Sequence, residues 1–327
     1  MAESKFVVKK ITNLSEMKEG DIIPVSDFSL LAENDKFVQF TFDEIESDNT
    51  IKISPGIYAV TKVSHQVTIK PTAFIKESIL DDYGIAQSVS SKIDSFFNAL
   101  PKYKKMGVFP KRGILLYGPP GVGKTQVISS VCTKYALEQN AAVILWSTSE
   151  FDASEVKSLI RRLTYENVEK FFLIAEDIGG AEYVGGQMAV KASLLSLLDA
   201  MEETFQKPTM ILATTNYPEN LLEMLTNRPQ RFDDKIEVPS PSPEARSKFL
   251  AFFMERAENP SLEGIEEIKQ KKYDGLSVAH VKEVVVRSEI YGISIIESLE
   301  QINKESQKAK KHFIKENRTG FGFGAEE

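Results

Sequence analysis

From residue 113 to residue 238 the chain alternates short, mostly apolar runs with longer segments whose apolar residues recur at helical spacing. Most of the short runs lack polar residues at alternate positions, so we expect each to be a strand that is buried on both faces. Strands of this kind that alternate with helices predict an α/β fold, in which a parallel sheet is covered by helices. The runs are 113–117, 141–146, 171–175, 210–215 and 235–238.

The segments between these runs predict helices. Residues 126–139 contain no proline or glycine and place their apolar residues near helical spacing. The same pattern predicts helices at 155–163 and 192–201, and a further helix at 86–100 before the first run. We assign residues 76–240 to one large α/β domain on this basis.

Residues 1–75 have a different pattern. Three stretches alternate apolar and polar residues with a period of two, which is typical of half-buried strands. We therefore predict a small β-rich N-terminal domain, which serves packing or subunit contact, or the capture of a substrate. The β-rich stretches are 37–42, 51–53, 57–63 and 67–70.

After the proline-rich segment 239–243 the strand pattern stops. Residues 241–308 predict a small helical domain, with helices at 244–258, 261–269, 278–288 and 293–308. Residues 309–327 are polar, carry an excess of lysine and end in alternating glycine and phenylalanine. They predict a flexible basic tail, with a partner or nucleic-acid contact as the alternative.

Composition narrows the possible functions. The chain has 327 residues, 42% of them hydrophobic, and a net charge of −7, which disfavours sequence-independent DNA binding by its whole surface. The single Cys132 excludes an internal disulfide, and the three histidines lack zinc-type spacing. Residues 1–10 lack the apolar core of a signal peptide, and the longest apolar runs are too short to span a bilayer, so we expect a cytoplasmic protein without membrane contact.

One motif organises the chemistry of the large domain. The sequence G-x-x-x-x-G-K-T follows a predicted strand and opens a predicted helix, which is the context that a phosphate-binding loop requires. Its backbone N–H groups and the helix start favour bound phosphate. We expect Lys124 to contact the β- and γ-phosphates and the hydroxyl of Thr125 to bind Mg²⁺. The residues of this nucleotide-binding loop are Gly118, Pro119, Pro120, Gly121, Val122, Gly123, Lys124 and Thr125.

Two further strand ends carry candidate catalytic groups. The run 171–175 is followed by Glu176 and Asp177, and two carboxylates at the end of an apolar strand are costly unless they face an ion or water. We assign Glu176 to Mg²⁺ and Asp177 to orienting and deprotonating the attacking water. Asn216 follows the run 210–215 and is suited to sense the γ-phosphate or the attacking water, with a turn cap as its alternative role.

A pair of arginines completes the set of candidate residues. Arg228 and Arg231 lie three residues apart, beside a proline and just before the last strand. The fixed fork of an arginine side chain suits a γ-phosphate that is presented by a neighbouring subunit. The lysines at 102, 104, 105 and 111, with Arg112, form a second basic group, which is interpreted as a solvated edge or as a nucleic-acid site.

Over roughly residues 79–298 the chain resembles the AAA branch of the AAA+ ATPases. The matching motifs are 118–125 (Walker A), 174–177 (Walker B), 213–216 (sensor 1) and 228–233 (second region of homology). The resemblance implies a P-loop AAA+ domain with a helical lid, and a homo-oligomeric ring, usually a hexamer, with ATP and Mg²⁺ at each interface. It also implies that Arg228 and Arg231 act in trans, and that the adenine lies near Asp82, Tyr83 and Gly84.

Within this family the chain looks most like the mitochondrial Rieske-assembly chaperone branch and phage-borne relatives. The Glu-Asp pair, the segment 193–199 and the segment 80–85 carry this likeness. The usual Walker B order is Asp-Glu, so the reversed order implies slower hydrolysis or a differently held water. An aromatic-Val-Gly-Gly sequence begins at Tyr183, which either touches substrate in a central pore or belongs to an ordinary mobile loop.

The motifs together predict an ATP-hydrolysing ring protein that remodels or moves a macromolecular substrate, with protein as the favoured class. A nucleic-acid machine that uses the basic tail or the lysines near residue 104 is the first alternative. The second is a nucleotide-gated scaffold with low turnover, for which the reversed acids are the argument.

Overall fold

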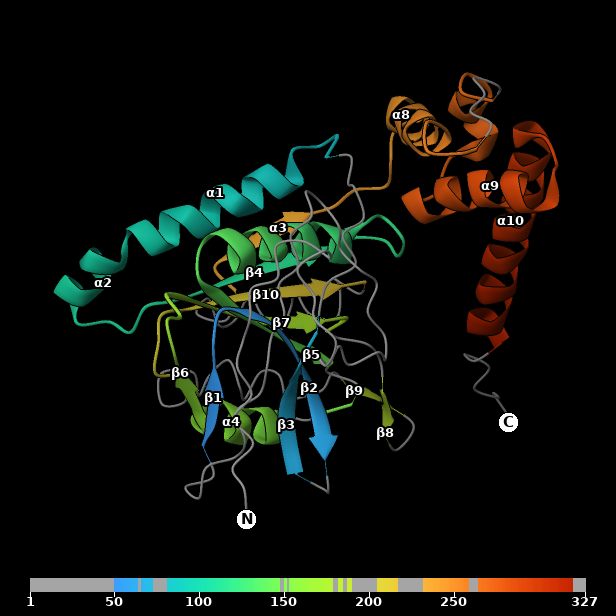
Figure 1. The fold of residues 1–327 in the computed structure, drawn as a ribbon. Coiled ribbons are helices and arrows are strands. Elements are labelled where there is room, and N and C mark those ends of the chain that lie inside the picture. Colours follow the sequence, from blue (N-terminus) through green and yellow to red (C-terminus); the bar gives the residue numbers. More distant parts are fainter. Residues whose placement is uncertain are drawn as a thin grey trace, which may run out of the picture. The chain divides into compact units, whose positions relative to one another are not determined.

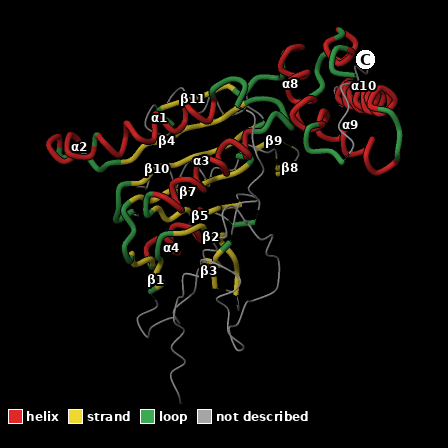
Figure 2. The backbone as a smooth tube through the Cα atoms, turned by 45° about the horizontal axis from the view of Figure 1, so that its top comes forward, coloured by secondary structure: helices red, strands yellow, loops and turns green. Residues whose placement is uncertain are grey.

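A seven-stranded sheet forms the centre of the first of two compact units in the computed structural model (Figures 1 and 2). The structure describes residues 50–63, 66–72, 81–147, 150–151, 153–178, 182–184, 187–189, 205–216, 232–258 and 264–319. The strand order is β11-β4-β10-β7-β5-β2-β3, and every neighbouring pair is parallel except β2 and β3. The strands are β2 (Gly56–Val63), β3 (Gln66–Pro71), β4 (Lys111–Tyr117), β5 (Ala141–Ser147), β7 (Lys170–Glu176), β10 (Thr209–Thr215) and β11 (Asp234–Glu237).

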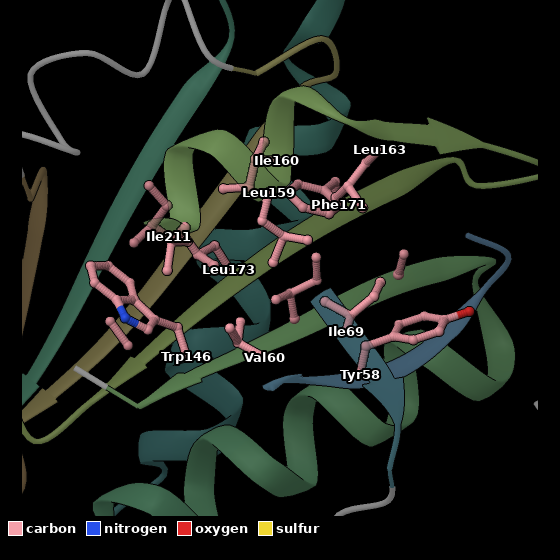
Figure 3. Close-up of a cluster of buried hydrophobic side chains, with 14 of the residues drawn as sticks. Tyr58, Val60, Ile69, Trp146, Leu159, Ile160, Leu163, Phe171, Leu173 and Ile211 are labelled. Carbon is pink, nitrogen blue, oxygen red and sulfur yellow. The ribbon is translucent and has the colours of Figure 1, made fainter. Parts of the chain in front are cut away.

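Helices cover both faces of this sheet. Phe172 of β7 lies against Phe97 of α1 and Tyr135 of α3, whereas its neighbour Phe171 belongs to a cluster that includes Leu159 of α4 (Figure 3). Consecutive residues of a strand point to opposite faces, so α1 and α3 lie on one face and α4 lies on the other. The helices of this unit are α1 (Ile85–Asn98), α2 (Leu100–Met106), α3 (Lys124–Glu138) and α4 (Ala153–Arg161).

The N-terminal strands β2 and β3 belong to the main sheet, in contrast to the separate β domain that we predicted for residues 1–75. β2 pairs in parallel with β5, from Gly56 beside Ala142 to Ala59 beside Leu145. Val60 and Ile69 are buried in the same apolar cluster as Trp146 (Figure 3). The alternating pattern therefore marks strands at the edge of the large sheet, which are half-buried in the same way as those of a small sheet. The predicted strand at 37–42 lies outside the described residues.

Two smaller sheets complete the first unit. β1 (Ile51–Ile53) pairs in parallel with β6 (Leu163–Tyr165), and β8 (Glu182–Val184) forms an antiparallel hairpin with β9 (Gln187–Ala189). Ile51 and Leu163 extend the apolar cluster around Phe171. The helix predicted at 192–201 lies outside the described residues.

The second unit contains residues 238–327 together with 118–123 of the phosphate loop. Its apolar core includes Leu250, Val281, Val284 and Leu299, all fully buried. Side-chain hydroxyls cap two of its helices: Ser242 accepts from Ala245 N at α8, and Ser277 accepts from His280 N at α9. Its helices are α8 (Pro243–Met254), η2 (Glu267–Lys269), η3 (Lys271–Tyr273), α9 (Val278–Tyr291) and α10 (Ile295–Thr319).

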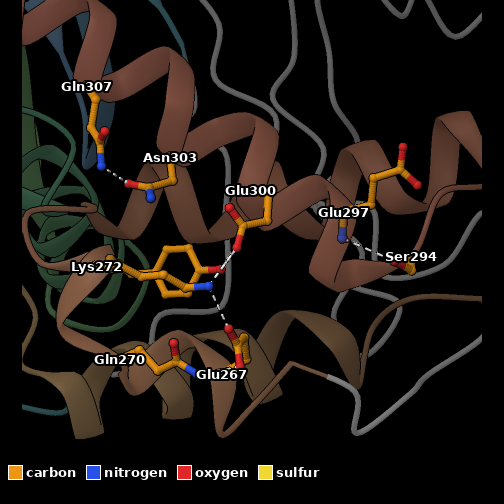
Figure 4. Close-up of polar contacts among 9 residues, drawn as sticks. Glu267, Gln270, Lys272, Ser294, Glu297, Glu300, Asn303 and Gln307 are labelled. Carbon is orange, nitrogen blue, oxygen red and sulfur yellow. Dashed lines mark hydrogen bonds and ion pairs between the residues drawn. The ribbon is translucent and has the colours of Figure 1, made fainter.

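Polar contacts in this unit differ greatly in burial. Figure 4 shows Lys272 Nζ between Glu300 (2.7 Å) and Glu267 (2.9 Å), an exposed cluster whose ion pairs are screened by solvent and contribute little to stability. Arg246 is only 2% exposed and donates to the carbonyls of Pro241 and Ile268 and to the carboxylate of Asp274. The buried arginine therefore ties the segment that enters α8 to the turns that precede α9.

The C-terminal helix is longer than we predicted. α10 continues to Thr319, whereas residues 309–327 were predicted to be a flexible tail, of which 320–327 lie outside the described residues. Residues 261–269 were predicted to be helical, and their described part forms a turn and the short helix η2. None of the helices in the described part of the chain combines the length and apolar character that a membrane crossing needs.

We predict that Ile69→Ala lowers the free energy of unfolding of the first unit by about 2–5 kcal/mol, because it leaves a cavity in the cluster around Trp146. Urea unfolding followed by the fluorescence of Trp146, the single tryptophan, measures this change. Val63→Ala, in the same hairpin but 58% exposed, is the matched control and should change stability by less than about 0.5 kcal/mol. An unaltered tryptophan transition in Ile69→Ala would show that the hairpin unfolds independently of the sheet.

Candidate active site

The carboxyl ends of three neighbouring strands carry the candidate catalytic groups. β4, β10 and β7 are adjacent and parallel, so their carboxyl ends lie at one edge of the sheet. Asn216 directly follows β10, Glu176 is the last residue of β7, and Asp177 comes next. In open parallel sheets this edge is where ligands bind.

A chain of two hydrogen bonds links the start of α3 to the ends of β10 and β7. Lys124 Nζ donates to Asn216 Oδ1 at 2.6 Å, and Asn216 Nδ2 donates to Asp177 Oδ1 at 2.5 Å. An ammonium group can only donate and a carboxylate can only accept, so one orientation of the Asn216 amide satisfies both partners. The prediction that Lys124, Asn216 and Asp177 act together thus has a direct geometric basis.

Burial shapes the electrostatics of Lys124. The residue is only 5% exposed, and this desolvation lowers its pKa, while the negative charge of Asp177 acts in the opposite direction. A buried ammonium group is stabilised by an anion placed beside it. A phosphate group therefore fits the chemical requirement of this position.

Glu176 would be stabilised by a cation, whereas Lys124 is stabilised by an anion. Burial raises its pKa, and the neighbouring carboxylate of Asp177 raises it further. A cation next to the pair would relieve both effects, and Mg²⁺ commonly binds one or two carboxylates together with substrate phosphates and water. Thr125, in the first turn of α3, is exposed, so its hydroxyl is accessible to such an ion. No cluster of three or more His, Cys, Asp or Glu side chains that could hold a metal ion occurs among the described residues.

The glycines of the phosphate loop hold a backbone that other residues would strain. Gly118 and Gly121 have φ angles of 149° and 76°. A Cβ atom on Gly118 would overlap the carbonyl oxygen of Val238, and one on Gly121 would lie 2.6 Å from Ser277 Oγ. Both contacts lie within the second unit. The loop therefore needs glycine here for its conformation and also for the close approach of its neighbours.

The first turn of α9 contacts the loop directly. Ala279 N donates to the carbonyl of Gly121 at 3.0 Å, and Ser277 lies against the same glycine. The turn is stabilised by a reciprocal cap, in which His280 Nδ1 accepts from Ser277 N at 3.1 Å. Sequence reasoning missed Ala279, because a hydrogen bond between two backbone groups leaves no signature in the residue types.

The remaining predicted site residues have varied positions. Asp82, Tyr83 and Gly84 precede α1, and Gly84, with φ of 64°, is its N-cap residue, so their relation to a nucleotide base stays a prediction. Arg228 and Arg231 lie outside the described residues. Tyr183 is in β8 and pairs with Met188 of β9, and the structure does not describe its side chain.

Comparison with known proteins identifies this arrangement. Residues 114–240 match the model of the ATPase family associated with various cellular activities (AAA). The chain is 28% identical to the proteasome-activating nucleotidase of Sulfurisphaera tokodaii over 232 residues, which are 64% of this chain and 57% of that protein. It is 35% identical to the proteasome-activating nucleotidase of Methanocaldococcus jannaschii over 179 residues, covering 50% and 40%.

A second type of relative also matches the chain. The putative ribosome biogenesis ATPase nvl of Dictyostelium discoideum is 28% identical over 177 residues, which are 51% of this chain and 20% of that protein. The matched part of the chain thus spans little more than half the length of the Sulfurisphaera tokodaii protein and less than half the length of the other two relatives. Residues 114–240 thus resemble an AAA ATPase domain, and the α/β fold predicted from the sequence is confirmed.

Proposed function

We propose that this chain, whose residues 114–240 form an AAA ATPase domain, hydrolyses ATP in a ring of identical subunits and uses the turnover to remodel a protein substrate. The observation that carries the proposal is the pair of hydrogen bonds from Lys124 through Asn216 to Asp177. These bonds join a phosphate-binding lysine to an acid that can act on water. A binding module without turnover would need the lysine but not the acid.

The chain's own residues divide the work of binding. The backbone N–H groups of Gly121, Val122 and Gly123 and the ammonium group of Lys124 would hold the phosphates, and Thr125 with Glu176 would hold Mg²⁺. ATP supplies a phosphoryl group whose transfer to water releases free energy. Burial and the carboxylate of Asp177 raise the pKa of Glu176, and a divalent ion beside it would favour the charged form of this acid.

Asn216 connects the lysine that binds phosphate with the acid that acts on water. Its amide oxygen accepts from Lys124 and its amide nitrogen donates to Asp177. When Lys124 turns toward a phosphate, the amide loses its donor and is free to reorient. Asp177 then has an open lone pair with which it orients the attacking water and takes its proton.

Arg228 and Arg231 complete the site from the next subunit in our proposal. The fork of an arginine stabilises charge that develops on a transferred phosphoryl group, and supply in trans requires a ring. A hexamer is the copy number that the family likeness favours. The reversed order of Glu176 and Asp177 is our reason to place the chain nearest the Rieske-assembly chaperone branch and its phage-borne relatives.

Protein is the substrate class that the observations favour. The relatives that are named proteasome-activating nucleotidases act, by that name, on a protein machine. The net charge of −7 disfavours a polyanionic substrate. The hairpin of β8 and β9, which carries Tyr183 soon after the acids of β7, is our candidate for the segment that contacts the substrate.

Lys124→Ala should weaken ATP binding about 100-fold, because a charge-assisted hydrogen bond to phosphate contributes up to roughly 3 kcal/mol. Titration with a fluorescent ATP analogue measures the affinity. Lys134→Ala, on the exposed side of the same helix, is the matched control and should bind as the wild type does. Near wild-type affinity in Lys124→Ala would remove the basis for the phosphate-loop assignment.

Arg228→Ala should retain ATP binding but lose turnover by roughly 10³-fold or more, as expected for a missing arginine finger. Asp177→Asn should also be inactive, for lack of the base. Rings mixed from the two inactive variants should regain part of the activity, since some interfaces then pair an intact Asp177 with an intact Arg228. Phosphate release is measured across mixing ratios, and its absence at every ratio would argue against a shared site.

An unfolded polypeptide should raise the ATPase rate, whereas double-stranded or single-stranded DNA should not. Tyr183→Ala should lower the ratio of stimulated to basal turnover, and Tyr291→Ala, an exposed tyrosine of the second unit, should leave that ratio unchanged. Steady-state phosphate release at low and high salt measures both effects. Stimulation by DNA that falls steeply with salt would favour a nucleic-acid machine instead.

A further inference from the structure

We infer that Thr214 is a positioning residue for Asp177, and that its hydroxyl fixes the backbone of the proposed base from the neighbouring strand. Thr214 is the second-last residue of β10 and is 1% exposed. Its Oγ1 accepts from Asp177 N at 3.0 Å, and its carbonyl accepts from Ile178 N at 2.8 Å. The inference rests on the proposed role of Asp177 in hydrolysis.

The hydroxyl of Thr214 accepts a hydrogen bond just beyond the point where the backbone pairing of β7 with β10 ends. The two strands are paired in register from Thr209 beside Phe171 to Ala213 beside Ala175. Beyond that point β7 leaves the ladder, and Asp177 has a left-handed backbone with φ of 50°. Its N–H group still needs an acceptor, and the carbonyl of Thr214 already accepts from Ile178. The side-chain oxygen of Thr214 gives the N–H group of Asp177 an acceptor of its own, beside the carbonyl that accepts from Ile178.

The left-handed turn makes this support necessary. A residue other than glycine in this region costs free energy, and it persists where its surroundings determine the conformation. Two consecutive N–H groups, those of Asp177 and Ile178, are both held by Thr214. Ile178 is 1% exposed, so its side chain anchors the far side of the turn. The conformation of Asp177 is thus held between one hydroxyl and one buried side chain.

The turn determines where the carboxylate lies. Asp177 Oδ1 accepts from Asn216, which is two residues beyond Thr214, and Asn216 accepts from Lys124. The segment 214–216 therefore holds both the backbone and the side chain of the proposed base. An aspartate reaches about one methylene less far than a glutamate, so its backbone position has more influence on where the carboxylate can act. Thr214 affects the reacting geometry in this way without touching a substrate.

A purely structural role would favour a different residue at this position. Met210, Ile211, Leu212 and Ala213 precede Thr214 on β10, and all are buried. Valine has the same shape as threonine and lacks the hydroxyl, whose burial is costly unless it is hydrogen-bonded. Thr209, at the opposite end of the same strand, is also fully buried, but its hydroxyl donates to the nearby carbonyl of Lys207. Thr209 is therefore a matched control that lies far along the strand from Asp177.

The test compares Thr214→Val, Thr214→Ser and Thr209→Val in the full chain. We expect Thr214→Val to lower kcat by about 10²-fold, the loss that a misplaced catalytic group can produce, with ATP affinity close to that of the wild type. Thr214→Ser keeps the acceptor and should recover most of the activity. Thr209→Val should keep a wild-type kcat even if its melting temperature falls. If Thr214→Val does not fold, Thr214→Ala serves in its place.

Hydrogen exchange provides a readout that does not depend on turnover. The amides of Asp177 and Ile178 should exchange faster in Thr214→Val than in the wild type, and at the wild-type rate in Thr209→Val. If the wild type releases no phosphate, the proposal of hydrolysis fails, and the exchange rates still decide whether Thr214 holds the turn. The inference is overturned if Thr214→Val keeps wild-type exchange at these amides, if its kcat equals that of Thr209→Val, or if Thr214→Ser is as impaired as Thr214→Val.

Discussion

The buried ammonium group of Lys124 needs hydrogen-bond acceptors, and residues at the ends of the neighbouring strands supply them. A cation that is 5% exposed needs hydrogen-bond acceptors in place of water, and the amide oxygen of Asn216 supplies one at 2.6 Å. That amide then points its nitrogen toward Asp177, whose carboxylate is the next acceptor. Because β4, β10 and β7 are adjacent and parallel, the sheet brings these groups to one edge without help from a long loop. The amide is neutral, so an incoming phosphate would add a negative charge directly beside the ammonium group of Lys124.

The phosphate loop has a different set of neighbours from the lysine that follows it. Residues 118–123 make their contacts with the second unit, through Val238, Ser277 and Ala279, whereas Lys124 begins a helix of the first unit. The chain passes from one unit to the other within the motif itself. The bond from Ala279 N to the carbonyl of Gly121 joins the start of α9 to the loop within the second unit.

Local patterns were sufficient for the parts of the fold that depend on local chemistry. The apolar runs that become β4, β5, β7 and β10 are buried on both faces, and a continuous run is the signature of that environment. The choice of pairing partner is not a local property. β2 and β3 alternate as any half-buried strands do, and only the structure shows that β2 pairs with β5. The sequence marked Asn216 and Asp177 as candidate site residues at strand ends, but the bridge that Asn216 forms between Lys124 and Asp177 depends on side-chain distances that spacing does not encode.

The conformation at the end of β7 gives a physical reason for the reversed order of the two acids. Glu176 is still in the strand, where it pairs with Ser147 of β5. Asp177 has turned into the left-handed region, where aspartate is found several-fold more often than most residues because its short side chain bonds locally. A glutamate at 177 would be less suited to that backbone, and its extra methylene would push the carboxylate past an amide that now lies 2.5 Å away. The shorter acid is therefore matched to the turn and to Asn216, and the reversed pair is consistent with an intact site in which the carboxylate is placed by the backbone rather than by the length of its side chain.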